Sequence, residues 1–300
     1  MGVGAVETFD QAVTVFETVG MPAKNLAART RREYASDLRD LVAFLTEHEI
    51  THLAMVGLRD LEAYLAELDR RGLKGSSRNR KTHTIKTFFK WLETQEVLAV
   101  NPATQLVPPK ANKKEPRFLS EDEYRRLLRA CSHNARDAAI IEIFLQTGMR
   151  LSELAHLTIN DVELPKRITR DLDSMGSVRV RRKGGKLESI PLNYKACQAL
   201  AAYLKVRPKV DNDALFVTKF KSPMTARAIE YMVAKYLADA GIPNASVHTL
   251  RHTMATHHVA QGTDLKTVQE TLGHASLATT SIYVSLAKQA QKKALQEHAL

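Results

Sequence analysis

The sequence predicts a mainly α-helical protein with a small antiparallel β-sheet, divided into two domains. Apolar residues recur at the helical period over most of the chain, and a two-residue period is confined to the region around 178–192. A stretch with three prolines, four basic residues and no periodicity, residues 105–117, separates two regions of helical pattern. We therefore expect a helical domain at residues 1–104, a linker at 105–117 and a mixed domain at 118–300.

Helices are expected before the linker, because apolar residues follow the helical period at 34–45, 58–68 and 85–92. Thr30 is the expected N-cap of the first helix, and Gly72 ends the second. Ser76 or Ser77 is expected to cap the third helix.

The face of this third helix opposite its apolar side is purely basic. It carries Arg78, Lys81 and Lys86, and no acidic residue occurs from Arg70 to Lys90. Lys and Arg neutralise phosphates when a protein binds nucleic acid. We therefore predict that these three side chains contact DNA.

The second domain begins near residue 118 with a capping box. Ser120 is its N-cap and Glu123 its partner, and the helix continues through Leu128. Apolar residues at helical spacing predict further helices at 135–146, 151–157, 194–206, 225–240, 250–261, 265–272 and 277–296.

A β-hairpin is predicted between these helices. Residues 178–181 alternate valine with arginine, and Ile190 and Leu192 lie two residues apart on the far side. The turn is supplied by Lys-Gly-Gly at 183–185.

The charge balance favours a polyanionic partner. Lys and Arg number 44 against 33 Asp and Glu, which gives a net charge of +11 and a pI near 9.6. Residues 1–110 contribute 15 basic and 14 acidic residues, so nearly all of the excess lies in residues 111–300. Nucleic acid is the first candidate. A membrane surface is disfavoured, because no basic amphipathic helix has a strong aromatic face.

Composition excludes other classes of protein. With 44% hydrophobic and 26% charged residues, the chain is not disordered, collagenous or fibrous. Its N-terminal residues lack a signal-peptide core, and no apolar run approaches membrane-spanning length. Cys131 and Cys197 fall in helical patterns rather than in a disulfide framework. We expect a soluble, intracellular protein.

Histidines gather near the C-terminus, at positions 248, 252, 257, 258 and 274. His248 and His252 have the spacing of a helical zinc pair, but Thr249 stands where the zincin motif has glutamate, and no cysteine is near. A metal site is therefore disfavoured.

Two arginines lie in the same motifs. Arg251 shares a helical face with His248, and Arg150 opens another helix just after a glycine. Two such arginines suit a phosphodiester whose charge spreads in the transition state.

Four motifs in a fixed order closely resemble those of the tyrosine recombinase (phage integrase) family: TGMRLSELAHL at 147–157, RRKGGKLESIPL at 181–192, HTLRHTMATH at 248–257 and LGHASLATTSIY at 272–283. The resemblance covers nearly the whole chain. It implies an all-α core-binding domain (a SAM-like helical bundle) at 1–104, and an α+β catalytic domain of the tyrosine recombinase type at 118–300 with a tail helix at 286–300. With no extra N-terminal domain visible, the chain is more similar to Xer-type chromosome-dimer resolvases than to large phage integrases.

By position, the resemblance implies a phosphate clamp and a nucleophile. Arg150 and Arg251 would hold the scissile phosphate, and Tyr283, nine residues after Leu-Gly-His, would attack it to form a 3′-phosphotyrosyl link. Glu153, at the family's usual acidic position, would orient the site.

The same resemblance implies proton donors and acceptors. Lys183 would protonate the leaving 5′-oxygen, and His248 would hydrogen-bond the phosphate or accept the tyrosine's proton. His274 would support phosphate and nucleophile. Because the hairpin reads RRKGGK where many relatives read GKGxK, Lys186 is a rival to Lys183.

The family implies catalysis without metal, ATP or another cofactor, on double-stranded DNA with paired recombination sites. It also implies strand exchange through a Holliday junction by a homotetramer, with a second related recombinase as an alternative partner. Lys113 and Lys114 in the linker are expected to contact DNA. We expect a cytoplasmic, nucleoid-associated protein that acts in chromosome segregation.

Five other interpretations stay open. The same chemistry serves a transposon or phage integrase, a plasmid resolvase and a type IB topoisomerase-like nicking-closing enzyme. From another class, the chain could be a DNA-binding accessory protein that has lost catalysis, which the complete set of motif residues disfavours. A metal hydrolase is the most distant alternative.

Overall fold

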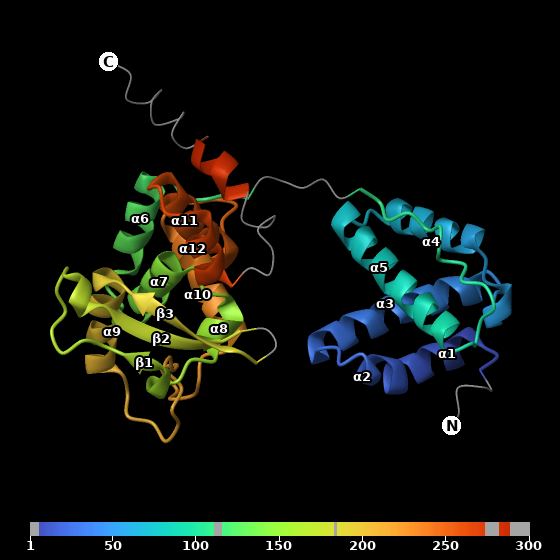
Figure 1. Ribbon diagram of the computed structural model, residues 1–300, viewed down its shortest axis with the longest axis horizontal. Coiled ribbons are helices and arrows are strands. Elements are labelled where there is room, and N and C mark those ends of the chain that lie inside the picture. Colours follow the sequence, from blue (N-terminus) through green and yellow to red (C-terminus); the bar gives the residue numbers. More distant parts are fainter. Residues whose placement is uncertain (1–5, 111–115, 183–184, 274–281, 289–300) are drawn as a thin grey trace, which may run out of the picture. The chain divides into compact units, whose positions relative to one another are not determined.

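The computed structural model describes residues 6–110, 116–182, 185–273 and 282–288. The chain divides into two compact units, Met1–Lys114 and Glu115–Leu300 (Figure 1). The predicted fold class, mainly α with a small antiparallel sheet in two domains, is confirmed. In the described part of the chain, no helix is long and apolar enough to cross a membrane.

The N-terminal unit is all helical. Its elements are α1 (Phe9–Val15), a π-helical turn (Phe16–Gly20), α2 (Met21–Ala23), α3 (Ala28–Glu47), a 3-10 turn (Leu53–Met55), α4 (Leu58–Arg70) and α5 (Gly75–Thr94). The helices predicted around residues 34–45, 58–68 and 85–92 are therefore confirmed as α3, α4 and α5.

The predicted caps of two of these helices are wrong. α3 begins after Ala27, so Thr30 lies within its first turn. α5 begins after Lys74 and includes both candidate serines. In each case the N-cap makes no side-chain hydrogen bond, so packing rather than capping fixes where the helix starts.

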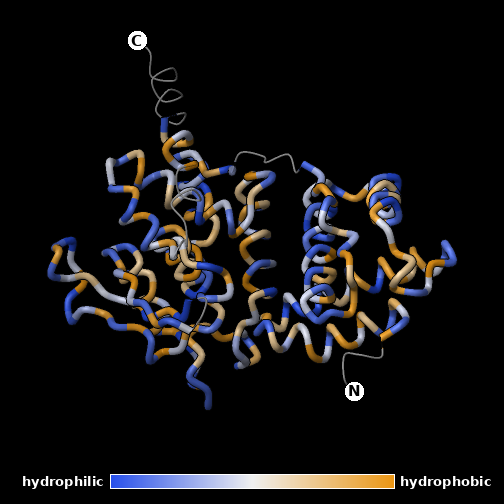
Figure 2. The backbone as a smooth tube through the Cα atoms, turned by 45° about the vertical axis from the view of Figure 1, so that its right-hand side comes forward, coloured by the Kyte–Doolittle hydropathy of each residue, from blue (hydrophilic) through white to orange (hydrophobic). Residues whose placement is uncertain are grey.

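Aromatic residues close the core of this unit. Phe9 of α1 contacts Phe88 and Phe89 of α5 at ring-centroid distances of 5.5 and 5.9 Å. Phe16 contacts Trp91 at 5.0 Å. Such pairs stabilise a core beyond the area that they bury. They hold the N-terminal segment against α5. The sequence periodicity did not predict a helix in this segment. Hydrophilic and hydrophobic stretches alternate along the helices, as one buried face requires (Figure 2).

The C-terminal unit combines helices with a three-stranded sheet. Its helices are α6 (Glu121–Cys131), α7 (Ala135–Thr147), α8 (Leu151–Ala155), α9 (Tyr194–Val206), α10 (Ala226–Asp239), α11 (Val247–Ala260) and α12 (Leu265–Leu272). Residues 282–288 are also helical, within the helix predicted at 277–296, of which 277–281 and 289–296 lie outside the described residues. Ser120 caps α6 by the predicted capping box with Glu123.

The sheet has the order β1-β2-β3 and is antiparallel throughout. Its strands are β1 (Val162–Glu163), β2 (Gly176–Arg181) and β3 (Leu187–Leu192). Val178 pairs with Ile190, and both side chains are buried, as the alternation predicted. β1 is only two residues long, so it carries no periodic signal.

The turn after α7 places the residues that follow. α7 is buried on almost every face and packs against α9 and α11. Gly148 ends it in the left-handed conformation, with φ of 59°. A Cβ atom there would lie 2.8 Å from the Leu272 side chain, so α7, the start of α8 and the end of α12 meet closely only because residue 148 is glycine.

Candidate active site

Arg150 is the N-cap residue of α8, directly after the Gly148 turn. Its backbone N–H donates to Glu153 Oε2 and its Nη1 donates to Glu153 Oε1, both at 2.7 Å. Its Nη2 donates to the carbonyl oxygen of Gly273, at the end of α12, at 2.8 Å. The side chain stays 37% exposed, so it is oriented by the protein yet accessible to a ligand.

Arg251 approaches the same place from α11 and is buried. Its Nη1 donates to Gly148 O at 2.5 Å and its Nη2 to Leu272 O at 2.8 Å. Burial, and then the charge of Arg150, lower the pKa of Arg251 to about 10. The group is still a cation near neutral pH. Two predicted clamp residues from separate motifs are thus brought together at the C-terminal end of α12.

Tyr283 is buried beside them, in the helical residues 282–288. It packs in a cluster that includes Met254, Leu272 and Leu286. Its hydroxyl oxygen lies 3.0 Å from His252 Nδ1. Burial raises the pKa of this hydroxyl, and the charge of Arg251 opposes that effect.

His252 was not assigned to the site from the sequence. Burial, followed by the charges of His248 and Arg251, lowers its pKa to about 4. It is therefore neutral near pH 7 and can accept the Tyr283 proton, provided that Nε2 carries the ring hydrogen. The sequence signal for His252 is its position beside Arg251 and one turn after His248, a spacing that also fits a pair of metal ligands.

His248 lies in the first turn of α11 and is exposed. Lys183, His274, Lys113 and Lys114 lie outside the described residues. The rival lysine, Lys186, is 76% exposed in its side chain and pairs with Glu188 at 3.1 Å. Within the described ranges, no group of three or more His, Cys, Asp or Glu side chains could hold a metal ion.

A second residue missed from the sequence is Arg182, which follows β2. Its side chain is 6% exposed and pairs with Glu153 at 2.9 Å and with Glu188 at 3.0 Å. Glu153 thus holds two arginines. The signal in the sequence was an arginine directly before Lys183, where the similar family motif has glycine.

The predicted DNA-binding face of α5 needs correction. Lys81 is buried, and its Nζ lies 2.7 Å from Asp40 and 3.2 Å from Asp37. Lys86 donates its Nζ to the carbonyl oxygens of Thr104 and Leu106, both at 2.9 Å. These lysines therefore stabilise the unit internally. The periodicity of α5 did not show that acidic residues of α3 lie opposite Lys81.

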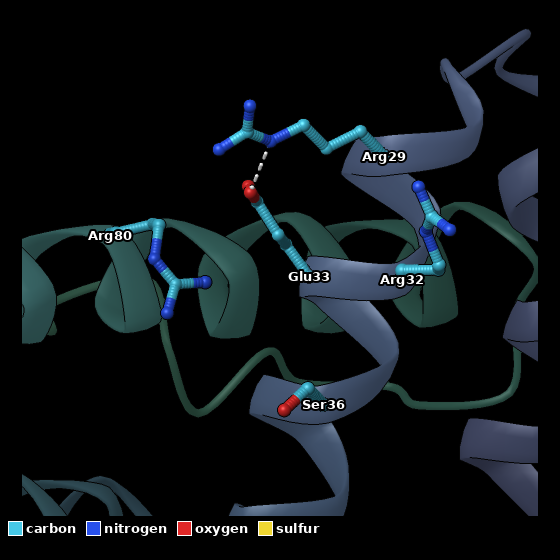
Figure 3. Close-up of a pocket in the computed structure, with 5 residues that line it drawn as sticks. All are labelled: Arg29, Arg32, Glu33, Ser36 and Arg80. Carbon is cyan, nitrogen blue, oxygen red and sulfur yellow. Dashed lines mark hydrogen bonds and ion pairs between the residues drawn. The ribbon is translucent and has the colours of Figure 1, made fainter. Parts of the chain in front are cut away.

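Arg78, the third predicted contact, is partly buried and pairs with Asp69 at 2.8 Å. Exposed arginines instead flank a pocket between α3 and α5 (Figure 3). The pocket is lined by Arg29, Arg32, Glu33, Ser36 and Arg80. Such a group of guanidinium groups can bind phosphate oxygens.

Comparisons with known proteins agree with both units. Residues 117–290 match the model of the phage integrase family, and residues 21–96 match the N-terminal SAM-like domain of phage integrases. The chain is 36% identical over 272 residues to tyrosine recombinase XerC of Staphylococcus carnosus (strain TM300), covering 88% of each chain.

Solved structures of recombinases are also similar to this chain over most of its length. A crystal structure of XerA recombinase is 29% identical, with a TM-score of 0.53, over 97% of this chain and 99% of that one. XerH site-specific recombinase, crystallised with a palindromic difH substrate as a post-cleavage complex, is 24% identical with a TM-score of 0.76, over 94% and 83% of the two chains. The similarity to XerH, at this identity, supports the fold alone.

Proposed function

The chain belongs to the phage integrase family, and on this premise we propose that it is a site-specific DNA recombinase. It cleaves and rejoins DNA strands by the tyrosine mechanism of that family. The observation that carries the assignment to particular residues is the meeting of Arg150, Arg251, His252 and Tyr283 around the C-terminal end of α12.

The arginines supply the phosphate clamp. Arg150 and Arg251 each donate to a backbone carbonyl oxygen at the end of α12. A phosphate oxygen is a stronger acceptor than a carbonyl, because it carries negative charge. On binding, the scissile phosphate accepts from further N–H groups of the same two guanidinium groups, each of which has five donors, and the two groups stabilise the charge that develops in the transition state.

Tyr283 supplies the nucleophile. Its hydroxyl oxygen attacks the phosphorus atom, and its proton passes to His252, with His248 as the alternative acceptor. The bond from phosphorus to the 5′-oxygen breaks, and Lys183 gives that oxygen a proton. The product is a 3′-phosphotyrosyl link and a free 5′-hydroxyl. Reversal with another 5′-hydroxyl rejoins strands without ATP, because the covalent link keeps the energy of the phosphodiester.

A suicide substrate tests this assignment. Duplex DNA with a nick next to the cleavage site loses a short fragment after attack, which traps the covalent complex. The wild-type protein should give an adduct that survives denaturing electrophoresis, and peptide mapping should place it on Tyr283. Tyr283→Phe should bind DNA and give no adduct. The matched control is Tyr231→Phe, because Tyr231 is 75% exposed. An adduct in Tyr283→Phe would contradict the assignment.

The assembly belongs to the same proposal. We propose a homotetramer on two DNA sites, which exchanges strands through a Holliday junction, with a second related recombinase as the alternative composition. Support comes from a solved relative, similar in fold, described as a lambda integrase tetramer bound to a Holliday junction. Sizing of the protein with one-site and two-site DNA measures the stoichiometry. A complex of two protomers on two sites would contradict the tetramer.

The biological role we propose is resolution of chromosome dimers in the cytoplasm, on nucleoid DNA. Support comes from the similarity to XerC over 88% of both chains. A plasmid resolvase, a transposon or phage integrase and a type IB topoisomerase-like enzyme share the chemistry. A plasmid that carries two candidate repeats tests the last of these, because relaxation of supercoils without recombinant products would favour the topoisomerase-like activity.

A further inference from the structure

Arg182 is a buried cation that the proposed mechanism does not use. Its Nη1 lies 2.9 Å from Glu153 Oε2, and its Nε lies 3.0 Å from Glu188 Oε2. Its Nη2 donates to Thr271 O at 2.6 Å and its Nη1 to Leu272 O at 3.4 Å. A guanidinium group with four such contacts points into the protein, so its role is not to touch DNA.

Glu153 links Arg182 to the phosphate clamp. One carboxylate oxygen accepts from Arg150 Nη1, while the other accepts from the Arg150 backbone N–H and from Arg182 Nη1. Burial alone would raise the pKa of Glu153, but the hydrogen bonds from Arg150 and the charge of Arg182 outweigh it, so the pKa is lowered. Glu153 therefore stays ionised and orients Arg150 by two hydrogen bonds.

The C-terminal end of α12 is a second link. Arg150, Arg182 and Arg251 together donate to the successive carbonyl groups of residues 271–273. Gly273 has a φ of 63°, and a Cβ atom on it would lie 2.9 Å from Arg182 Cζ. The arginine thus packs directly against the glycine that ends α12. The negative end of the helix dipole meets three cations there.

We propose that Arg182 is a positioning residue for DNA cleavage, which acts through Glu153 and the end of α12 to hold Arg150 in the orientation that binds the scissile phosphate. The proposal rests on the proposed function. Without Arg182, Glu153 is held by one arginine instead of two, and the carbonyl of Thr271 loses its charged donor. Arg150 then samples other orientations, and the clamp is formed for less of the time.

The charge of the scissile group provides a test that separates positioning from structural support. A methylphosphonate replaces one non-bridging oxygen by a methyl group, so it is uncharged and depends less on an arginine clamp. Two suicide substrates, one with the ordinary phosphodiester and one with a methylphosphonate at the scissile position, are compared in single-turnover cleavage. The variants are Arg182→Met, Glu153→Gln as a second way to weaken the link, and Arg150→Ala as the reference. Arg181→Met is the matched control, because Arg181 directly precedes Arg182 in the chain and is exposed.

Arg182→Met should cleave the phosphodiester about ten- to a hundredfold more slowly than the wild type, as expected for a displaced catalytic group. Its loss on the methylphosphonate should be much smaller, which is the pattern expected of Arg150→Ala. Glu153→Gln should show the same pattern, and Arg181→Met should match the wild type on both substrates. Affinity for uncleaved duplex should not change in Arg182→Met.

Two results would overturn the inference alone. Equal losses on both substrates in Arg182→Met and Glu153→Gln would show that these residues only support the fold. Wild-type rates in both variants would show that neither orients Arg150. A wild-type protein that cleaves neither substrate at any candidate site would instead contradict the proposed function, and the inference with it.

Discussion

Tyr283 and His252 are buried in a way that opposes their ionisation. Burial raises the pKa of the Tyr283 hydroxyl and lowers that of His252 to about 4. The pair is therefore a neutral hydrogen bond of 3.0 Å. In the proposed mechanism, this burial favours transfer of the tyrosine proton together with formation of the new bond to phosphorus, because it disfavours the charged form of each partner.

This burial predicts a pH-dependent stability. A histidine in an unfolded chain has a pKa of about 6.5, whereas the folded value for His252 is about 4. Above the unfolded value both states are neutral. As the pH falls from there towards the folded value, the unfolded state takes up a proton that the folded state does not, so the free energy of unfolding falls by up to about 1.4 kcal/mol per pH unit. Denaturant titrations of His252→Gln between these pH values should show a shallower fall than the wild type.

Exposed His257 provides the control for this experiment. His257→Gln should keep the steep fall of the wild type. An unchanged slope in His252→Gln would show that His252 is not held neutral by the fold.

The assignment of the general acid is a second prediction at the residue scale. A 5′-bridging sulfur is a good leaving group and needs little protonation. A substrate with this sulfur should restore cleavage in Lys183→Ala but not in Arg150→Ala, because the arginine stabilises a different charge. Lys186 is exposed and paired with Glu188, so Lys186→Ala should cleave both substrates as the wild type does. Restoration by sulfur in Lys186→Ala instead would exchange the roles of the two lysines.

Among the elements, α5 shows how a basic residue can stabilise the packing of helices instead of binding DNA. Lys81 connects α5 to two acidic residues of α3, and Asp37 is only 2% exposed. Lys81→Met should lower the stability of the N-terminal unit by up to about 3 kcal/mol, because carboxylates would remain buried with fewer partners. Thermal unfolding measures the loss. Lys90→Met, at an exposed position of the same helix, should cost little, and DNA affinity in folded Lys81→Met should equal that of the wild type.

Elements with a strong periodic signal were predictable, and contacts between them were not. The hairpin register follows from Val178 and Ile190, and α9 and α12 have the bounds that their apolar residues predict. Helix starts at Ala28 and Gly75 were misplaced, because no side chain caps them. Tyr283 was identified only through the family resemblance, and the contact between Tyr283 and His252 joins positions 31 apart, which a local pattern does not contain.

At the scale of the whole molecule, the net charge of +11 predicts strongly salt-dependent DNA binding. Each neutralised phosphate releases counterions, so the logarithm of the association constant should fall steeply with the logarithm of the salt concentration. Arg32→Ala, in the pocket between α3 and α5, should reduce this slope by about one. Arg59→Ala removes an exposed charge on α4 and serves as the control. A slope near zero for the wild-type protein would contradict phosphate binding.

We propose that the C-terminal tail, residues 289–300, links one protomer to the next. Residues 282–288 hold both Tyr283 and Leu286, which are buried in one cluster, so a chain cut after residue 288 retains the proposed nucleophile and this neighbour. Removal of residues 289–300 should therefore preserve cleavage of a one-site suicide substrate. It should abolish assembly on two sites if, as we propose, these residues dock on a neighbouring protomer. Native electrophoresis of one-site and two-site complexes compares the two steps. Normal two-site assembly by the shortened chain would contradict the docking, while lost one-site cleavage would show that the tail supports the nucleophile of its own chain.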